Sequence, residues 1–326
     1  MQPTPGDVHI DRALTNVSIA YLQNPQKFVA DKVFPRIPVT FKSDKIAKFD
    51  KQPWMRSQAK ARALSTESAG GGYTVTTDSY AAEVYAIHKD IDDQVRANAD
   101  APFAPDRNAT NWVTGQLLLQ REIQFMSKFF VTGLWTTEWS GVASDSPNAA
   151  LYQFERWDRA GSTPIADVIG RCTAVEKLCG ERPNVGVIQR SVFDALKTNS
   201  DIVSRVQYTS RDSIDLEILA RLFELDELVL ASAVYDSAEE GAAASQDFVA
   251  GKHMLLAFRQ SEPALDAISA GYIPVWTGYL GAGAYGNRIK KFRMEHLNSD
   301  RVEGELAYDM KVVCADAAAF MLSAVS

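Results

Sequence analysis

The segment from Asn108 to Leu134 constrains the fold most strongly, because its apolar residues recur at helical spacing. Successive members lie seven, four, three and four residues apart, which brings their side chains onto one face of an α-helix. The members of this predicted face are Trp112, Leu119, Ile123, Met126 and Phe130. A helix of about 25 residues is roughly 37 Å long, about the width of a small domain. We therefore expect a spine helix between two differently composed halves of the chain.

Capping residues mark the expected limits of this spine helix. Pro105 precedes it, and Asn108 or Thr110 is the expected N-cap, whose side-chain oxygen accepts from the free N–H groups of the first turn. Gly133 is the expected stop. A second, polar face of the helix is predicted to carry Arg121, Gln124 and Lys128.

Composition allows two globular domains. The 326 residues are 46% hydrophobic and 23% charged, which is ordinary for a folded chain of this length. The net charge of −7 argues against a free nucleic-acid-binding protein, since such proteins usually present a basic surface. Cys172, Cys179 and Cys314 have no metal-binding or redox spacing, so we expect reduced core residues. The sequence has no predicted signal peptide or membrane span, and assembly in a cytoplasm is expected.

Charge is distributed unevenly along the chain. Residues 42–62 contain seven basic residues against Asp44 and Asp50, whereas residues 223–251 contain seven acidic residues and no Lys or Arg. The basic residues are Lys42, Lys45, Lys48, Lys51, Arg56, Lys60 and Arg62. The acidic residues are Glu224, Asp226, Glu227, Asp236, Glu239, Glu240 and Asp247. This asymmetry predicts attraction between the two segments, within one chain or between copies.

The first 80 residues read as an arm followed by a projection. Residues 1–41 hold five prolines among scattered apolar anchors, a pattern typical of a segment that lies along another surface. Residues 41–80 are polar and basic, contain three successive glycines, and end in the strand-like YTVTTDSY. We expect a long hairpin that projects from the body; the alternative is a disordered basic linker.

The second half alternates strands with helices. Thr163 and Pro164 are expected to open a helix that Gly180 closes, and Ser191 is expected to cap another. Predicted strands lie at 185–188, 228–231 and 253–258, a helix is expected at 213–223, and 136–161 is expected to be loop-rich. This order favours an α/β layer with a buried sheet. The tail, 288–325, alternates as antiparallel strands with a turn at 298–300, and is expected to pack back onto the spine helix.

No motif predicts a catalytic, cofactor or metal site. Residues 281–286 match G-x-G-x-x-G, but a strand pattern follows instead of the helix that a dinucleotide site needs, so we interpret them as a connector. Asp90, Asp92 and Asp93 are interpreted as a solvated helix start in preference to a cation site. The four histidines are widely separated, and we expect structural or surface roles for them.

The order of these segments resembles the major capsid proteins of tailed phages, whose fold encapsulins share. The similar stretches include VFPRIPV, NATNWVTGQLLLQREI, FERWDRAGSTPIADV, RPNVGVIQRSVFDALKTNSDIVSRVQY, LEILARLFELDELVLASAVYDSA and RVEGELAYDMKVVCADAAAFML. The resemblance implies an α+β fold with a long spine helix and an inserted α/β domain. It implies an N-terminal arm at 1–41, an extended hairpin loop at 42–80, a peripheral domain at 81–161 and 279–326, and an axial domain at 162–278.

The resemblance implies a structural protein and no enzyme. Copies are expected to form the pentamers and hexamers of an icosahedral shell around double-stranded DNA, in the virion, after assembly in a bacterial cytoplasm. A separate scaffolding protein and a portal are expected partners, together with a decoration protein and non-specific contacts to the packaged DNA. The alternatives are an encapsulin-like compartment and a nucleotide-binding α/β enzyme. The expected contacts between subunits are Lys42, Lys45, Lys48, Lys51, Trp54, Arg56, Lys60, Arg62, Glu224, Asp226, Glu227, Glu239 and Glu240.

Overall fold

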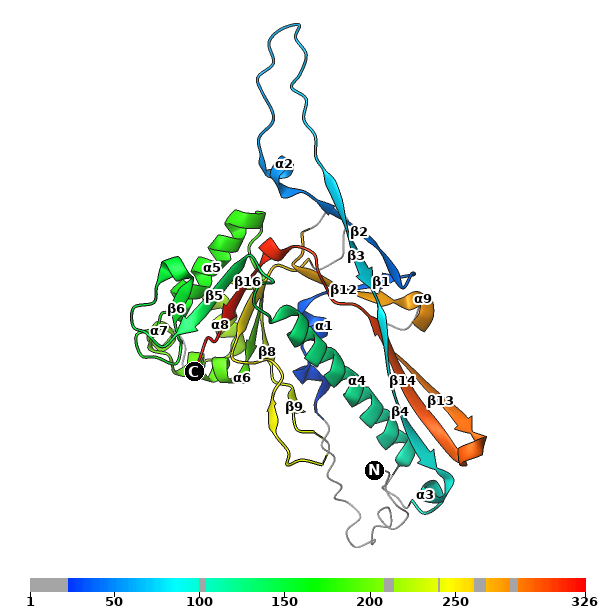
Figure 1. Ribbon diagram of the computed structural model, residues 1–326. Helices are drawn as coiled ribbons and strands as arrows, with labels where there is room; N and C mark the ends of the chain where they lie inside the picture. Colours follow the sequence, from blue (N-terminus) through cyan, green and yellow to red (C-terminus); the bar gives the residue numbers. More distant parts are fainter. Residues whose placement is uncertain (1–22, 100–103, 208–213, 240, 261–267, 282–286) are drawn as a thin grey trace.

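The described part of the molecule contains two six-stranded sheets, a projecting two-stranded hairpin and a smaller two-stranded hairpin, together with the helices (Figure 1). The computed structural model describes residues 23–326 apart from 100–103, 208–213, 240, 261–267 and 282–286. The long helix α4 (Pro105–Phe129) lies along the first sheet, and the hairpin extends beyond both sheets. None of the helices in these ranges is both long enough and apolar enough to cross a bilayer.

The first sheet is built around one long central strand. β14 pairs antiparallel with β4 on one side and with β13 on the other, and β12 joins β14 to β1. The strands are β1 (Arg36–Val39), β4 (Glu83–Asp92), β12 (Gly271–Trp276), β13 (Asn287–Met294), β14 (Ser299–Tyr308) and β15 (Lys311–Val312). A turn at Asn298, in the left-handed conformation at φ 45°, precedes β14. The predicted antiparallel pairing across residues 298–300 is confirmed, whereas β15 pairs with β12.

Helix α4 packs closely against β14. A Cβ placed on Gly304 would lie 2.5 Å from Cγ1 of Val113 and 2.7 Å from Cδ1 of Leu117, so only glycine leaves room for the helix at this point. The expectation that the tail packs on the spine helix is therefore confirmed. Phe34, from the N-terminal arm, contacts the same helix, with its ring centroid 4.7 Å from that of Phe129.

The buried face of α4 differs from the predicted one. Trp112 is 41% exposed, and neither Leu119 nor Ile123 is fully buried. Arg121, predicted to lie on a polar face, is only 7% exposed. The helical periodicity correctly predicted a helix. Large apolar residues lie on two neighbouring faces of it, and the prediction assigned the buried role to the wrong one. The buried residues are Ala109, Val113, Leu117, Arg121, Glu122, Phe125, Met126 and Phe129.

The start of α4 was also misplaced. Pro105 occupies the first turn, and the N-cap is Ala104, which makes no side-chain cap hydrogen bond. Thr110 lies inside the helix, where its hydroxyl donates to the carbonyl of Asp106 at 2.9 Å. The fixed φ of proline suits the first turn of a helix, so Pro105 sets the start without a capping side chain.

The second sheet is mixed and has β16 at its centre. Its order is β6-β5-β16-β11-β7-β8, with β5, β6 and β16 parallel and β11 antiparallel to its neighbours. The strands are β5 (Thr137–Val142), β6 (Gln153–Glu155), β7 (Val185–Gln189), β8 (Glu227–Ala231), β11 (Met254–Ala257) and β16 (Ala318–Leu322). The helices are α5 (Pro164–Cys179), α6 (Arg190–Thr198), α7 (Ser200–Val206) and α8 (Leu216–Leu222). Val187, Leu255 and Phe320 are fully buried in this sheet.

Sequence signals located most of the second sheet. Strands β7, β8 and β11 and helix α5, with Gly180 as its left-handed C-cap, lie where they were predicted. The N-cap of α6 is Gln189, not Ser191. The range 136–161, expected to be loop-rich, also contains the strands β5 and β6. Both strands are short and only partly buried, so no apolar run identifies them.

Some strands belong to a different sheet from the one that the expected domain limits would place them in. β12 falls within 162–278 but belongs to the first sheet, whereas β5, β6 and β16 fall outside that range and belong to the second. The remaining elements are α1 (Ala30–Val33), β2 (Ser43–Phe49), α2 (Lys51–Met55), β3 (Val75–Ala81), α3 (Asp93–Ala97), β9 (Val234–Asp236), β10 (Gln246–Phe248) and α9 (Thr277–Leu280).

Candidate subunit-contact surfaces

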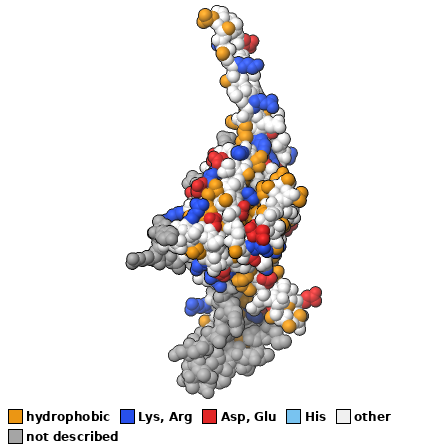
Figure 2. Space-filling model, turned by 90° about the vertical axis from the view of Figure 1, so that its left-hand side faces the viewer, with side chains coloured by type: hydrophobic (Ala, Val, Ile, Leu, Met, Phe, Trp, Pro, Cys, Tyr) orange, Lys and Arg blue, Asp and Glu red, His pale blue; other side chains and the backbone are white. Residues whose placement is uncertain are grey.

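The expected projecting hairpin is present. β2 and β3 pair antiparallel in a register that sets Lys45 opposite Ser79 and Lys48 opposite Thr76. Beyond α2, residues 56–74 run out and back without a helix or strand, and most of their side chains are exposed. Figure 2 shows Lys and Arg side chains spaced along this projection. A segment with so little core of its own is suited to lie on another molecule.

Two ion pairs hold the base of the hairpin on the chain's own body. Lys51 of α2 pairs with Asp316, which also accepts a hydrogen bond from the Thr136 hydroxyl at 2.6 Å. Lys311 of β15 pairs with Asp78 of β3 at 2.8 Å. The hydrogen bond from Lys311 lowers the pKa of Asp78. Burial raises the pKa of Asp316, but hydrogen bonds from Lys51 and Thr136 outweigh it and leave that pKa below its usual value.

The predicted basic contact residues therefore differ in their surroundings. Lys51 is engaged within the chain, and the guanidinium of Arg62 donates to the carbonyl of Thr66. Trp54 is 63% exposed, with its ring centroid 5.3 Å from that of Tyr73. The other predicted basic residues of this segment are exposed, namely Lys42, Lys45, Lys48, Arg56 and Lys60.

The predicted acidic residues do not form a single uncompensated surface. Arg182 pairs with Glu224, and Arg259 pairs with Glu227, so the fold supplies basic partners that the local sequence lacks. Asp226 and Glu239 are exposed. The length of β8, roughly 17 Å at 3.3 Å per residue, separates the group at 224–227 from the β9–β10 hairpin that carries Glu239. Glu240 lies outside the described residues.

A buried carboxylate seats the arm on α4. Oε2 of Glu122 accepts hydrogen bonds from the backbone N–H groups of Val29 at 2.9 Å and Ala30 at 3.0 Å. Beside it, Arg121 pairs with Asp31. Burial raises the pKa of Glu122 to about 7, despite the two backbone donors. The sequence analysis did not identify this contact. A carboxylate at a buried position of α4 is the sequence feature that could have indicated it.

The arm is also held by the separate two-stranded hairpin of β9 and β10. The side-chain amide of Gln23 donates to the carbonyl of Val234 and accepts from its N–H at 3.0 Å. This paired contact imitates a strand pairing with β9. The described part of the arm thus joins α4 at one point and the β9–β10 hairpin at another.

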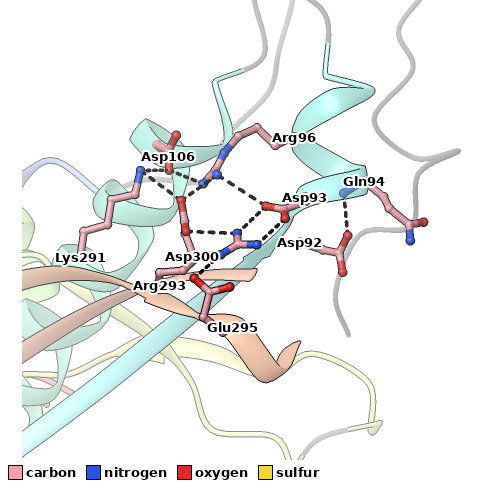
Figure 3. A network of polar contacts seen from close by, with 9 residues as sticks. All are labelled: Asp92, Asp93, Gln94, Arg96, Asp106, Lys291, Arg293, Glu295 and Asp300. Carbon is pink, nitrogen blue, oxygen red and sulfur yellow. Dashed lines mark hydrogen bonds and ion pairs between the residues drawn. The ribbon is translucent and has the colours of Figure 1, made fainter. Parts of the chain in front are cut away.

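An ion-pair network fixes the far end of the first sheet (Figure 3). Arg96 of α3 contacts Asp300 of β14 at 2.7 Å and Asp106 of α4 at 3.0 Å. Arg293 of β13 makes two contacts with Asp93, at 2.6 and 2.7 Å, and a third with Asp300 at 3.4 Å. Hydrogen bonding from Arg96 lowers the pKa of Asp300. The network therefore binds α3 and the start of α4 to two strands.

The aspartate cluster of the sequence is divided between separate roles. Asp90 forms a bidentate pair with Arg301 at 2.7 and 2.8 Å, and Asp92 caps α3 by accepting from the N–H of Gln94. Within the described ranges, no three His, Cys, Asp or Glu side chains are arranged to hold a metal ion. The motif at Gly281–Gly286 lies outside the described residues, apart from Gly281, which caps α9.

The thiols and the buried histidine have structural surroundings. Cys172, Cys179 and Cys314 are free thiols, and burial raises the pKa of Cys172 to about 11. Nδ1 of His253 accepts a hydrogen bond from the N–H of Ser323 at 3.0 Å, and burial lowers the pKa of this histidine. An imidazole that accepts at Nδ1 and resists protonation is neutral at pH 7.

Two six-stranded sheets, a long helix along one of them, a projecting hairpin and an arm held on that helix characterise the fold. The chain has the fold of phage major capsid proteins, which encapsulins share, and the resemblance inferred from its sequence is confirmed.

Curated relatives and solved structures carry this assignment. The chain is 24% identical over 232 residues to the major capsid protein of Burkholderia phage BcepMu, covering 69% of this chain and 70% of that protein. It is 24% identical over 257 residues to the major capsid protein of Pseudomonas phage JBD67, covering 77% of each. No protein-family model matches the chain.

Similar folds extend over nearly the whole chain. A phage-related protein from Bordetella bronchiseptica RB50 superposes with a TM-score of 0.67 at 20% identity, covering 91% of this chain and 92% of the other. The capsid of cyanophage P-SCSP1u gives 0.60 at 12% identity, covering 97% and 93%. An encapsulin from Synechococcus elongatus PCC 7942 gives 0.55 at 10% identity, covering 97% and 95%.

Proposed function

We propose that the chain is a structural major capsid protein, whose copies assemble into the pentamers and hexamers of an icosahedral shell around double-stranded DNA. The observation that carries the proposal is the hairpin at 42–80, which projects past both sheets with exposed basic and aromatic side chains. In the proposed shell, other copies of the chain cover these exposed side chains. The curated relatives, both named major capsid protein, support the same role.

The proposed division of the subunit follows the resemblance. Residues 1–41 act as the arm and 42–80 as the extended loop, while 81–161 with 279–326 form the peripheral domain and 162–278 the axial domain. Axial domains meet around the symmetry axes, and the arm and loop reach neighbouring copies. Ion pairs within the chain already occupy Lys51, Glu224 and Glu227. The proposed charged contacts between copies are therefore made by exposed side chains such as Lys45, Arg56, Asp226 and Glu239.

The proposed role has further partners and a location. A scaffolding protein and a portal guide assembly in the bacterial cytoplasm, and a decoration protein binds the finished shell. Packaged DNA meets the shell by non-specific contacts. The chain is then a component of the virion. A structural role of this kind requires no catalysis.

Electron microscopy of the chain, expressed alone and together with the neighbouring genes of its genome, tests the proposal. We expect closed shells or tubes tens of nanometres across. Small uniform oligomers under every condition would contradict it and direct attention to a nucleotide-binding screen of the glycine motif.

An encapsulin-like compartment is the second candidate, favoured by the similarity to the Synechococcus encapsulin. The two candidates differ in content. Shells from infected or induced cells contain double-stranded DNA if the chain is a capsid protein, and protein cargo without a genome if it forms a compartment. Nuclease-protected DNA recovered from purified shells distinguishes them.

A further inference from the structure

Residues 24–35, which we call the strap, run from β9 to β1 past the C-terminal half of α4 (Figure 1). At the first end, the side-chain amide of Gln23 exchanges two hydrogen bonds with the backbone of Val234 in β9. At the second end, β1 pairs in parallel with β12. Both ends are thus held by uncharged hydrogen bonds, whereas α1, in the middle of the strap, rests on an acidic side chain. The contact between α1 and α4 is therefore the part of the strap that a change of protonation can affect.

Two carboxyl groups and one guanidinium meet at this contact. Glu122 is 0% exposed, and its Oε2 accepts hydrogen bonds from the backbone N–H groups of Val29 and Ala30. Next to it along the helix, Arg121 pairs with Asp31 of α1. The three side chains are neutral as a group when Glu122 is protonated. They carry one net negative charge, in a largely buried place, when Glu122 is ionised.

The described residues compensate an ionised Glu122 poorly. Its other oxygen, Oε1, is buried and accepts no hydrogen bond from them. Arg121 is engaged by Asp31, and Arg36 of β1 lies 3.9 Å from that same carboxylate. A buried charge on an oxygen without a donor costs free energy, whereas the neutral acid keeps both backbone hydrogen bonds.

The strands packed against α4 add only neutral groups beside this contact. Tyr308 of β14 donates its hydroxyl to Oε1 of Gln124 at 2.6 Å, and Tyr85 of β4 packs on it with ring centroids 5.2 Å apart. Burial raises the pKa of both phenols, so both are neutral at pH 7. Neither tyrosine supplies a charge that could balance Glu122.

We propose that the strap is a proton-dependent device: protonated Glu122 holds α1 on α4, and ionisation of Glu122 loosens the middle of the strap while its two ends stay attached. The buried apolar side chains of the strap, such as Val33 and Phe34, set how rarely the closed form opens. The proton sets how that frequency changes with pH. The device belongs to the single subunit and does not require a shell.

The sign and size of the effect follow from linkage. In the closed strap, burial raises the pKa of Glu122 from 4.5 to about 7, and opening exposes the carboxyl to water, which restores its ordinary value. Proton binding therefore favours the closed form. The opening equilibrium constant should rise about tenfold per pH unit between pH 4.5 and 7, about 300-fold in total, and level off above pH 7.

Hydrogen exchange of the full-length chain, read by mass spectrometry and corrected for the intrinsic pH dependence of exchange, tests the proposal. We expect the protection of strap peptides to fall by about 25-fold between pH 5.5 and 8. The strap should exchange faster than the buried strand β7 at each pH, which identifies local opening and not unfolding of the whole subunit.

Three variants assign the effect to Glu122. Glu122→Gln keeps an acceptor for the two N–H groups but does not titrate, so the corrected exchange should be independent of pH. Asp31→Asn frees Arg121 to pair with Glu122 and should reduce the pH dependence. Glu138→Gln is the matched control, because Glu138 also accepts from backbone N–H groups, those of residues 133–135, but lies outside the strap; its profile should match the wild type.

Each outcome decides for or against the device. Corrected exchange of the wild-type strap that does not change with pH overturns the proposal, and this result needs no variant to fold. A wild-type slope in Glu122→Gln, or an equal loss of slope in Glu138→Gln, overturns it as well. A chain that shows the expected profile but never forms shells contradicts the proposed function and supports the device.

Discussion

The carboxylate of Glu122, in the C-terminal half of α4, accepts a hydrogen bond from the backbone N–H of Val29 in the arm at 2.9 Å. It thereby acts as an external cap for the short helix α1, whose own N-cap residue is Val29 and offers no side-chain acceptor. The arm is attached to the body through a charged group buried at the interface between them. Such a group makes the attachment depend on protonation.

The first prediction concerns the pH dependence of stability. The pKa of Glu122 rises from 4.5 to about 7 on folding. The folded chain therefore binds this proton more tightly than the unfolded chain does. The resulting stabilisation is complete below pH 4.5 and is lost as pH rises through 7, amounting to about 3 kcal/mol. Glu122→Gln should remove this component. Urea unfolding between pH 4.5 and 8 measures it, and identical pH profiles for the two proteins would contradict the assignment.

The second prediction concerns packing between α4 and β14. Gly304→Ala places a methyl group within 2.7 Å of Val113 and Leu117 and should destabilise the subunit by about 1–3 kcal/mol. Gly115→Ala is the matched control on the helix itself. An added Cβ at Gly115 meets no atom within 4 Å, and alanine favours helix, so stability should rise by about 0.5–1 kcal/mol. Equal effects of the two substitutions would exclude close packing at Gly304.

The third prediction concerns the clamp at the base of the hairpin. Lys51→Glu sets two carboxylates together at Asp316 and should loosen α2 and β3, which is measured as faster amide hydrogen exchange in both elements. The double substitution Lys51→Glu with Asp316→Lys should restore protection. Lys60→Glu, at an exposed position on the same projection, serves as the control. Exchange that is unchanged in Lys51→Glu would show that the ion pair does not restrain the hairpin.

The fourth prediction concerns the far end of the first sheet. Asp300→Asn removes a charge shared by Arg96 and Arg293 and should speed amide exchange in α3, as should high salt. Because the pKa of Asp300 is lowered, this stabilisation is present at neutral pH and is lost as acid protonates the carboxylate. Asp194→Asn, which breaks an exposed pair with Arg190, should have little effect. Comparable changes in both variants would argue against a special role for the network.

Local signals in the sequence located elements well where one residue type decides the geometry. Pro164 and Gly180 bracket α5 as predicted, because proline fixes φ in a first turn and glycine adopts the left-handed conformation at a helix end. Trp112 was misassigned because helical periodicity alone does not say which of two apolar stripes is covered. The answer depends on β14, about 190 residues away in sequence, and on the glycine within it.

The contact residues were predicted less completely than the fold. The basic character of 42–62 was visible, but the partnership of Lys51 with Asp316 joins residues 265 apart in sequence. Glu224 and Glu227 appeared unpaired because Arg182 and Arg259 lie outside the local segment. Charge pairing across a fold is set by tertiary structure, so composition within a window overstates how much charge is available to a partner.

The position of β16 has a consequence for how the chain is made. This strand, Ala318–Leu322, lies at the centre of the second sheet between β5 and β11, yet a ribosome synthesises it after every other strand of that sheet. The sheet therefore closes only after β16 has been synthesised, because β16 joins the β6–β5 part of the sheet to the β11–β7–β8 part. A chain that ends before Ala318 should therefore leave the second sheet in two separate parts and fail to fold this unit.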